Sequence, residues 1–217
     1  MTTDNTLRFI EENKVIVIVR GVAKDDLIPL TEAMYLGGIR MVECTYDANG
    51  LVPDEEIAER IGDLVKHFND RMLIGAGTVM TVRQVELTQT VGGSFIISPD
   101  TNEEVIALTK KLGLVSIPGA ITPTEVAIAH RAGADFVKLF PIDLYGAKYI
   151  KMLRAPLSNV KLIAVNGITP ENMTEYLNAG AIGVGVGSGI VNKTYIKSGE
   201  FDRITSLAKE YTDKLNL

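Results

Sequence analysis

Residues 114–140 read LVSIPGAITPTEVAIAHRAGADFVKLF and hold one complete repeat of the pattern that decides the fold. An apolar run at 114–118 ends in a proline. The hydroxyl of Thr122 then precedes Pro123, a pair that suits the cap and the first position of a helix. A glycine ends the helical stretch, and a second apolar run follows at 135–140. This order predicts a β-strand, a helix and another β-strand joined by short turns, the unit of a parallel sheet.

The same unit recurs along the whole chain. Runs rich in Val and Ile, which indicate strands, occupy residues 15–20, 39–45, 72–76, 94–97, 114–118, 135–140, 160–166 and 182–187. Helical patterns occupy residues 24–36, 54–68, 81–90, 102–112, 123–132, 147–153, 170–178 and 201–215. A further helix, at residues 6–13, precedes the first strand.

Eight strands that alternate with eight helices predict an α/β fold, the (β/α)8 TIM barrel, here with an additional N-terminal helix. Residues 1–217 are expected to form this barrel as a single domain. The alternative arrangement is an open doubly wound sheet. The strand count disfavours it, and the turn after the first strand, Arg20-Gly21-Val22-Ala23, lacks the GxGxxG dinucleotide fingerprint.

Polar residues before two helical stretches are expected to cap them. Asp100 or Thr101 lies where its side chain would accept hydrogen bonds from the first turn of the helix at 102–112. Thr169 precedes Pro170, so we expect it to cap a helix that starts at that proline.

Composition argues against several classes of function. The 217 residues include 22 Lys or Arg and 27 Asp or Glu, a net charge of −5, which argues against nucleic-acid or anionic-membrane binding. Aromatic residues make up only 6%, too few for a base-stacking platform. One cysteine and two histidines argue against a disulfide or a zinc site. No signal-peptide pattern or membrane-spanning apolar run is found, so we expect a cytoplasmic protein.

In a (β/α)8 barrel the active site lies at the C-terminal ends of the strands, so polar residues there are candidates. They are Arg20, Glu43, Thr45, Thr78, Ser98, Pro99, Lys138, Asn166 and Ser188. Alternation along a strand narrows the choice, because successive side chains point to opposite faces. On each of the two strands that carry Lys138 and Glu43, one face is apolar and suits packing under the helices, such as the face that carries Cys44. Lys138 and Glu43 lie on the other face of their strands. Both are therefore predicted to point into the barrel.

A lysine and a glutamate inside a narrow barrel admit two interpretations: a buried structural ion pair, or an amine nucleophile beside an acid–base group. Burial and a nearby cation, here Arg20, lower the pKa of a lysine and leave free amine to attack a carbonyl. The carboxylate of Glu43 opposes that shift and moves protons to and from the reacting hydroxyl groups. The second interpretation predicts a Schiff-base enzyme that acts on a phosphorylated or carboxylated ketone without a metal or another cofactor.

Glycine-rich segments follow the last two strands, at Asn166-Gly167-Ile168 and at residues 183–189, GVGVGSG. Glycines at these positions expose backbone N–H groups, and barrels often bind phosphate there. The alternative is a loop with a purely structural role.

Six motifs, in order and in register with one barrel, carry a resemblance to a known family. They are Val19-Arg20-Gly21, the segment from Gly38 to Thr45 that ends in Val42-Glu43-Cys44-Thr45, Gly75-Ala76-Gly77-Thr78-Val79, Phe95-Ile96-Ile97-Ser98-Pro99, Pro118-Gly119-Ala120-Ile121-Thr122-Pro123-Thr124-Glu125 and Phe136-Val137-Lys138-Leu139-Phe140-Pro141. With them the sequence resembles, over nearly its whole length, the 2-keto-3-deoxy-6-phosphogluconate / 4-hydroxy-2-oxoglutarate (KDPG/KHG) aldolase family of class I pyruvate-dependent aldolases.

The resemblance implies a reaction and a role for each residue. Lys138 forms an imine with C2 of the pyruvyl unit, and Glu43 is the general acid–base. The residues that bind the small keto-acid substrate are then Arg20, Thr78, Pro99, Phe140, Asn166, Gly167, Gly187 and Ser188. The products are pyruvate with glyceraldehyde 3-phosphate, from a 2-keto-3-deoxy-6-phospho sugar acid, or pyruvate with glyoxylate, from 4-hydroxy-2-oxoglutarate. The family further implies a homotrimer without a metal.

Three segments depart from the family pattern. Many members carry Thr-Leu-Arg-Thr after the catalytic glutamate, with an arginine that contacts the substrate carboxylate, and Asp47 occupies that position here. The segments around Asn166 and Ser188 also differ from the usual Pro-Thr-Gly-Gly-Ile and Gly-Gly-Ser-Trp. These departures keep two alternatives open: an inactive metabolite-binding barrel that serves as a sensor or interaction module, and a phosphosugar isomerase barrel.

Overall fold

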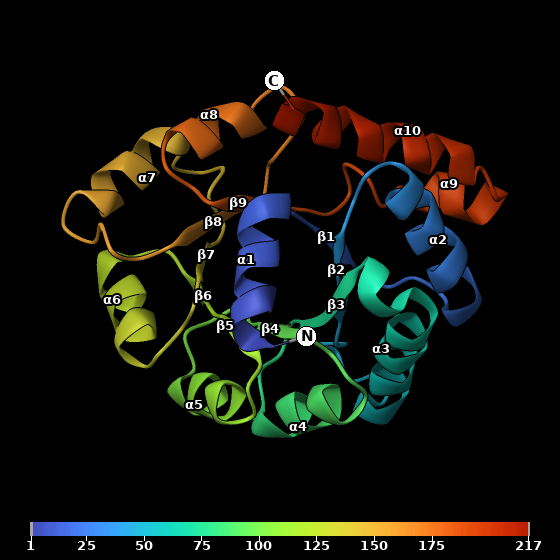
Figure 1. Ribbon diagram of the computed structural model, residues 1–217, viewed down its shortest axis with the longest axis horizontal. Helices are drawn as coiled ribbons and strands as arrows, with labels where there is room; N and C mark the ends of the chain where they lie inside the picture. Colours follow the sequence, from blue (N-terminus) through green and yellow to red (C-terminus); the bar gives the residue numbers. More distant parts are fainter. Residues whose placement is uncertain (1, 217) are drawn as a thin grey trace.

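The computed structural model describes residues 2–216 and contains a ring of parallel strands enclosed by helices (Figure 1). The strands are β1 (Val15–Val19), β2 (Met41–Thr45), β3 (Leu73–Gly77), β4 (Phe95–Ile97), β5 (Val115–Ile117), β6 (Gly119–Ala120), β7 (Val137–Leu139), β8 (Leu162–Val165) and β9 (Gly183–Val186). Their order around the ring is β5-β4-β3-β2-β1-β9-β8-β7-β6, and each paired neighbour is parallel.

Strand β5 lies within the predicted strand at residues 114–118, and β6 continues it beyond Pro118, which has no N–H to give to the ladder. β5 pairs with β4, and β6 pairs with β7. The backbone N–H of Lys138 donates to the carbonyl of Pro118 at 2.9 Å and continues the pairing across the interruption. The ring is therefore closed by eight strands, and the predicted barrel with an additional N-terminal helix is confirmed.

The helices alternate with the strands and surround them. They are α1 (Thr3–Asn13), α2 (Lys24–Leu36), α3 (Asp54–Phe68), α4 (Val82–Thr90), α5 (Glu103–Lys111), α6 (Pro123–Arg131), α7 (Ala147–Arg154), α8 (Met173–Asn178), α9 (Lys193–Ser198) and α10 (Phe201–Thr212), with short 3₁₀ helices η1 (Asn69–Arg71) and η2 (Asp213–Asn216). None of them, within residues 2–216, is long and apolar enough to cross a membrane.

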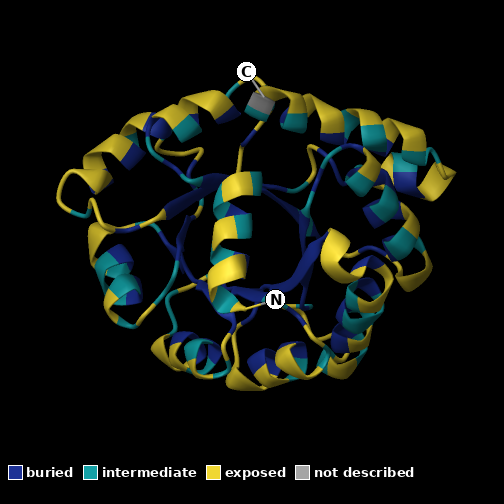
Figure 2. Ribbon diagram, viewed as in Figure 1, coloured by how far each residue is buried: buried dark blue, intermediate teal, exposed yellow. Residues whose placement is uncertain are grey.

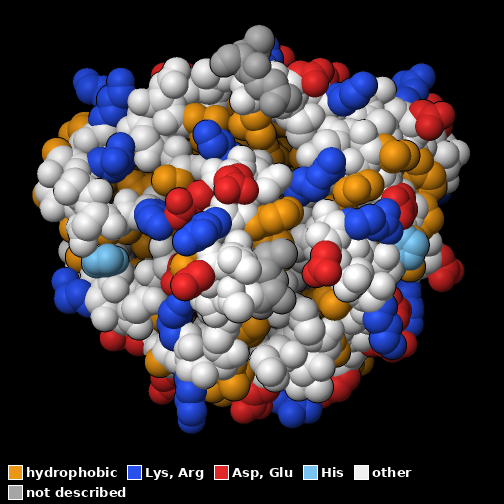
Figure 3. All heavy atoms as spheres, in the orientation of Figure 1, with side chains coloured by type: hydrophobic (Ala, Val, Ile, Leu, Met, Phe, Trp, Pro, Cys, Tyr) orange, Lys and Arg blue, Asp and Glu red, His pale blue; other side chains and the backbone are white. Residues whose placement is uncertain are grey.

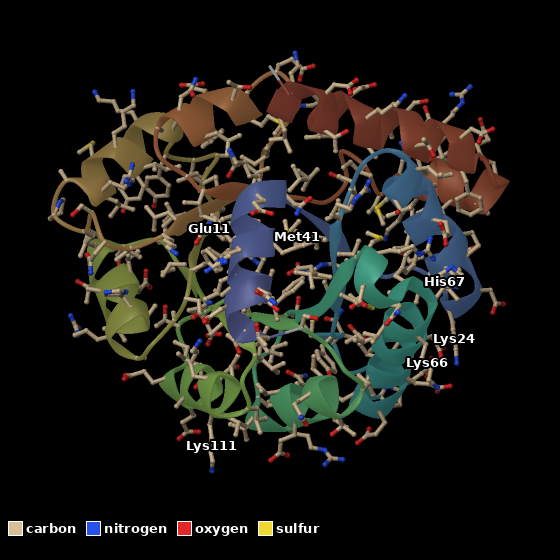
Figure 4. All side chains as sticks on the ribbon, viewed as in Figure 1. Glu11, Lys24, Met41, Lys66, His67 and Lys111 are labelled. Atoms are coloured by element: carbon tan, nitrogen blue, oxygen red, sulfur yellow. The ribbon has the colours of Figure 1, made fainter. Side chains whose placement is uncertain are left out.

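Both faces of the strands are buried, and the two faces belong to separate clusters (Figure 2). The inner cluster includes Met41 and Phe136, and Figure 4 shows Met41 within the ring. The outer cluster includes Cys44 and Val137, which pack between the sheet and the helices. The predicted alternation is therefore confirmed for both of the strands that carry the candidate catalytic residues.

Helix α1 lies in front of the ring in Figure 1, at the end where the strands begin. Ile10 of this helix is 1% exposed and packs into the inner cluster with Ile16, Met41 and Phe136. The helix thus covers the N-terminal end of the barrel and leaves the other end for function. On this covered face, acidic and basic side chains lie interspersed (Figure 3).

Two predicted helix caps are wrong. The side chain of Asn102, and not that of Asp100 or Thr101, accepts hydrogen bonds at the start of α5, because Thr101 donates its hydroxyl to the Gly119 carbonyl instead. Helix α8 begins at Met173 rather than at Pro170, since the residues between them form a turn. The short helix α9 was not expected.

Candidate active site

A cleft of about 750 Å³ opens at the C-terminal ends of the strands. Its lining includes nine of the site residues that the sequence predicts: Arg20, Thr78, Pro99, Lys138, Phe140, Asn166, Gly167, Gly187 and Ser188. The remaining one, Glu43, lines an adjoining cavity of about 10 Å³ together with Lys138. Thr45 and Ser98, also at strand ends, are buried and line neither cavity.

Strand β7 places Lys138 in the barrel. Its neighbours Val137 and Leu139 pack outward under the helices, so the lysine points inward. The residue is 6% exposed, and its Nζ lies 5.0 Å from the centroid of the Phe140 ring. Burial lowers the pKa of Lys138, the charge of Glu43 opposes this shift, and Arg20 adds to it. Neutral amine is therefore present at a lower pH than for a free lysine, as a nucleophile requires.

Strand β2 places Glu43 beside it. Glu43 is 1% exposed, and neither of its carboxylate oxygens has a hydrogen-bond partner among the described residues. Burial raises the pKa of this carboxyl group, against the opposing charges of Lys138 and Arg20. Within residues 2–216 no ion pair joins Glu43 to Lys138, which favours an amine nucleophile beside an acid–base group over a structural ion pair. A buried carboxyl group with free oxygens costs stability, which favours a chemical role.

The end of strand β3 shapes the space around the glutamate. Gly77 makes room for the carboxyl group, because a Cβ at this position would lie 2.6 Å from Cδ of Glu43. Thr78 follows with a φ of 56°, a left-handed conformation that is uncommon for threonine. Its hydroxyl accepts a hydrogen bond from Nη2 of Arg20 at 2.9 Å. The Gly-Ala-Gly-Thr motif thus holds a hydroxyl and a guanidinium at the edge of the cleft.

The loops after β8 and β9 offer backbone N–H groups. The amides of Gly167, Ser188 and Gly189 donate no hydrogen bond to any described residue, although all three residues line the cleft. Gly189 packs closely against the Tyr211 hydroxyl, since a Cβ there would lie 2.2 Å from that oxygen. Free N–H groups in a concave site favour the binding of an anion.

Asp47 does not line the cleft. Its carboxylate accepts hydrogen bonds from the backbone N–H groups of Asn49, Leu51 and Val52, at 3.1, 2.8 and 3.1 Å. The Asn49 bond contributes most to the lowered pKa of Asp47. The residue therefore orders the loop after β2, and Arg20 is the cation outside the pair whose charge acts on both Glu43 and Lys138.

The sequence did not single out several residues that line the cleft, among them Met80, Lys193 and Tyr211. Lys193 begins the unexpected helix α9, and an exposed lysine at a helix start carries no sequence signal for binding. The capping residue Asn192, directly after the glycine loop, is the feature that could have revealed the helix.

The two histidines lie outside the cleft. His67 lies on α3 at the outer side of the barrel (Figure 4) and contacts Glu32, while His130 on α6 contacts Asn159. Within residues 2–216, no group of three or more His, Cys, Asp or Glu side chains is placed to hold a metal ion.

The geometry therefore combines a buried amine of lowered pKa, a carboxyl group of raised pKa and an anion-binding end in one cleft. This combination suits Schiff-base chemistry on an anionic ketone. An isomerase barrel does not need an imine-forming lysine, because a glutamate base can move a proton between two carbons without one.

Comparisons with known proteins agree with this chemistry. Residues 6–207 match the model of a family described as KDPG and KHG aldolase. The chain is 36% identical over 175 residues to the 2-dehydro-3-deoxy-6-phosphogalactonate aldolase of Escherichia coli K12, covering 80% of this chain and 82% of the relative. It is 33% identical over 202 residues to the 2-dehydro-3-deoxy-phosphogluconate aldolase of Treponema pallidum, covering 93% of both chains.

A solved structure extends the similarity to three dimensions. The KDPG aldolase of Legionella pneumophila, captured with pyruvate as a covalent carbinolamine intermediate, superposes with a TM-score of 0.82 at 30% identity. The match covers 92% of this chain and 95% of that one. These findings identify an aldolase, a carbon–carbon lyase that releases pyruvate from 2-keto-3-deoxy phospho sugar acids, rather than an isomerase or an inactive barrel. The chain belongs to the KDPG and KHG aldolase family.

Proposed function

We propose that this chain is a cytoplasmic class I aldolase in which Lys138 is the nucleophile and Glu43 the general acid–base. Its substrate is a 2-keto-3-deoxy-6-phospho sugar acid, and its products are pyruvate and glyceraldehyde 3-phosphate. The observation that carries the proposal is the pairing of a buried lysine of lowered pKa with a glutamate whose oxygens are free. No metal or other cofactor is needed, because the iminium ion itself accepts the electrons of the broken bond.

The first half of the reaction forms the iminium ion. The neutral amine of Lys138 attacks C2 of the substrate ketone and gives a carbinolamine. Glu43, whose raised pKa favours the protonated form, gives its proton to the C2 hydroxyl, and water departs. The nitrogen then carries the positive charge, and Glu43 is left as a carboxylate.

The second half breaks the carbon–carbon bond. The Glu43 carboxylate, through a water molecule, takes the proton of the C4 hydroxyl. The C3–C4 bonding electrons move to the iminium nitrogen, which gives an enamine, and the distal fragment departs as an aldehyde. Protonation of the enamine at C3 and hydrolysis of the iminium release pyruvate and restore the amine of Lys138.

The other predicted residues hold the substrate in place. Arg20 and the Thr78 hydroxyl, already joined by a hydrogen bond, bind the C1 carboxylate and so take the place of the family arginine that is absent at Asp47. Pro99 and Phe140 flank the pyruvyl unit. A second set, from the loops after β8 and β9, binds the distal group: Asn166, Gly167, Gly187 and Ser188.

A coupled assay for released pyruvate tests the proposal. Wild-type protein should turn over 2-keto-3-deoxy-6-phosphogluconate or its galactonate epimer, and Lys138→Ala should bring turnover to background. The same assay with 4-hydroxy-2-oxoglutarate, which lacks the phosphate, shows whether the shorter dicarboxylate is also a substrate. Full turnover by Lys138→Ala, or no release of pyruvate from any of these keto acids, would contradict it.

A homotrimer is the second part of the proposal. Large apolar side chains are exposed on loops at the same end of the barrel as the cleft, with Leu51 83%, Leu144 76% and Tyr145 50% exposed. A trimer interface at this end of the barrel would bury these side chains, and burial of apolar surface drives association. Sedimentation equilibrium should give three times the mass of one chain, whereas a monomer at micromolar concentration would contradict the assembly.

A further inference from the structure

The described lining of the cleft contains three basic side chains, Arg20, Lys138 and Lys193, and no Asp or Glu. The catalytic glutamate lies in the smaller adjoining cavity. Elsewhere on the surface the two signs are interspersed, as Figure 3 shows for the face around α1. The cleft is therefore suited to a substrate with more than one negative charge. Lys138 and Arg20 have roles in the proposed reaction, and Lys193 has none.

Helix α9 fixes the position of Lys193. The side chain of Asn192 accepts hydrogen bonds from the N–H groups of Thr194 and Tyr195, at 3.0 and 3.2 Å, and so anchors the helix start. The lysine extends toward the turn after β1, where its Nζ lies 3.7 Å from the position of a Cβ built on Gly21. That turn also carries Arg20. Two cations from opposite ends of the sequence thus border one side of the cleft.

Lys193 also lacks a carboxylate partner. Within the described part of the chain it forms no ion pair, whereas Lys24, Lys110 and Lys161 each pair with an acidic side chain. The glycine loop that precedes it contributes the unused N–H groups of Ser188 and Gly189 to the same cleft. An unpaired ammonium group and unpaired N–H donors in the same cleft match the several acceptor oxygens of one polyvalent anion.

We propose that Lys193 binds the terminal phosphate of the substrate and makes this enzyme select phosphorylated over unphosphorylated distal fragments. The inference rests on the proposed function, because it adds Lys193 to the loops after β8 and β9 as a ligand of the distal group. A phosphate fits better than a distal carboxylate, since it brings a larger charge and three acceptor oxygens to a lysine and at least two N–H groups. Lys193 is thereby a specificity residue, in addition to the backbone loops.

The aldol direction gives a matched test, because the same pyruvate enamine can react with glyceraldehyde 3-phosphate or with glyceraldehyde. Lys193→Met removes the charge and keeps most of the side-chain length. Its kcat/KM for glyceraldehyde 3-phosphate should fall about 10- to 100-fold, mainly through KM, because a charge-assisted hydrogen bond is lost. Its kcat/KM for glyceraldehyde should change less than about twofold. Lys193→Arg should restore most of the loss, and Lys197→Met, at another exposed lysine of α9, should have no effect.

Formation of the pyruvate adduct separates this inference from the proposed function. Lys193→Met should form that adduct as wild type does, since Lys138 and Glu43, which carry out its formation, are unchanged. An equal loss with both aldehydes, no loss with either, or a failure of Lys193→Arg to recover the preference would overturn the role of Lys193 while the Schiff-base mechanism stands. A wild-type protein that forms neither the adduct nor any aldol product would overturn both.

Discussion

Glu43 and Lys138 line the same small and largely apolar cavity beside the cleft, and each shifts the pKa of the other. Burial acts on both in the same sense, since it disfavours the carboxylate and the ammonium ion alike. The result is a carboxyl group that can donate a proton and an amine that can attack. Arg20 supports this state for the lysine and opposes it for the glutamate.

The charges around Lys138 predict opposite pH shifts for two substitutions. Glu43→Gln removes the charge that raises the pKa of Lys138, so that pKa should fall further. Arg20→Met removes a charge that lowers it, so the pKa should rise. The free amine is the reactive form, so the rate of inactivation by an amine-directed reagent rises with pH. The midpoint of this rise should lie at lower pH in Glu43→Gln than in wild type, and at higher pH in Arg20→Met.

Glu43→Gln should also slow turnover by roughly 10²–10⁴-fold, because proton transfer to and from the reacting hydroxyl groups is lost. The pyruvate adduct should still form, but more slowly. Full activity in Glu43→Gln, or a lysine that titrates near its ordinary value in wild type and both variants, would contradict the assigned roles.

The sequence draws attention to Lys138 and Glu43 more clearly than to Lys193. Lys138 and Glu43 interrupt apolar strands, where a charge is costly, so their positions alone draw attention. Lys193 lies on an exposed helix start, where a lysine has no such cost, and only the folded chain brings it beside Gly21. The sequence likewise did not indicate the role of Asp47, because its hydrogen bonds to Asn49, Leu51 and Val52 depend on the conformation of the loop after β2.

Among the helices, α6 has the most complete start. The Thr122 hydroxyl accepts from the Glu125 N–H at 3.3 Å, and the Glu125 carboxylate accepts from the Thr122 N–H at 2.8 Å. Pro123 occupies the first turn, where its missing N–H costs nothing. The same glutamate accepts from the Ile121 N–H at 3.0 Å, so this capping box also ties the end of β6 to the helix.

Thr122→Ala should destabilise the protein by about 1 kcal/mol, since it removes the cap of α6. Urea unfolding measures the change, and Thr124→Ala, at an exposed position in the same helix, serves as the control. Formation of the pyruvate adduct should stay unchanged in both variants. A loss as large in Thr124→Ala as in Thr122→Ala would show that the capping box is not the cause.

Element boundaries were predicted well where the signals were long and less well where they were short. Helices α2 and α3 match the predicted residues at both ends, because each carries a long helical pattern. Helix α9 has six residues, too few for such a pattern to emerge. At the start of α8, Asn172 accepts from the Thr169 N–H at 2.8 Å, and this local turn replaces the helix expected at Pro170.

In the barrel as a whole, the residues that stabilise the fold and the residues of the candidate active site lie at opposite ends of the barrel axis. Helix α1 covers the end where the strands begin, and its Ile10 completes an inner cluster of apolar side chains. The opposite end carries the cleft, the buried carboxyl group with free oxygens and the strained Thr78. A (β/α)8 barrel tolerates this loss of stability, because the packing at the end covered by α1 does not depend on the residues around the cleft.

Ile10→Ala should therefore reduce the free energy of unfolding by about 2–5 kcal/mol, the usual cost of truncating a fully buried isoleucine. Leu36→Ala, at a side chain that is 69% exposed, should cost less than about 0.5 kcal/mol. Urea unfolding of both variants measures the difference. At a temperature where Ile10→Ala is folded, its kcat should equal that of wild type, and a tenfold loss of kcat would refute the separation.

The most direct measurement is reductive trapping of the enzyme with pyruvate. Borohydride reduces an iminium ion to a stable secondary amine, and peptide mass spectrometry then locates the added group. We expect one pyruvate-derived adduct per chain, on Lys138, formed only when pyruvate and borohydride are both present, and absent in Lys138→Ala. An adduct on another lysine, or none at all in protein that is folded, would contradict Schiff-base catalysis by Lys138.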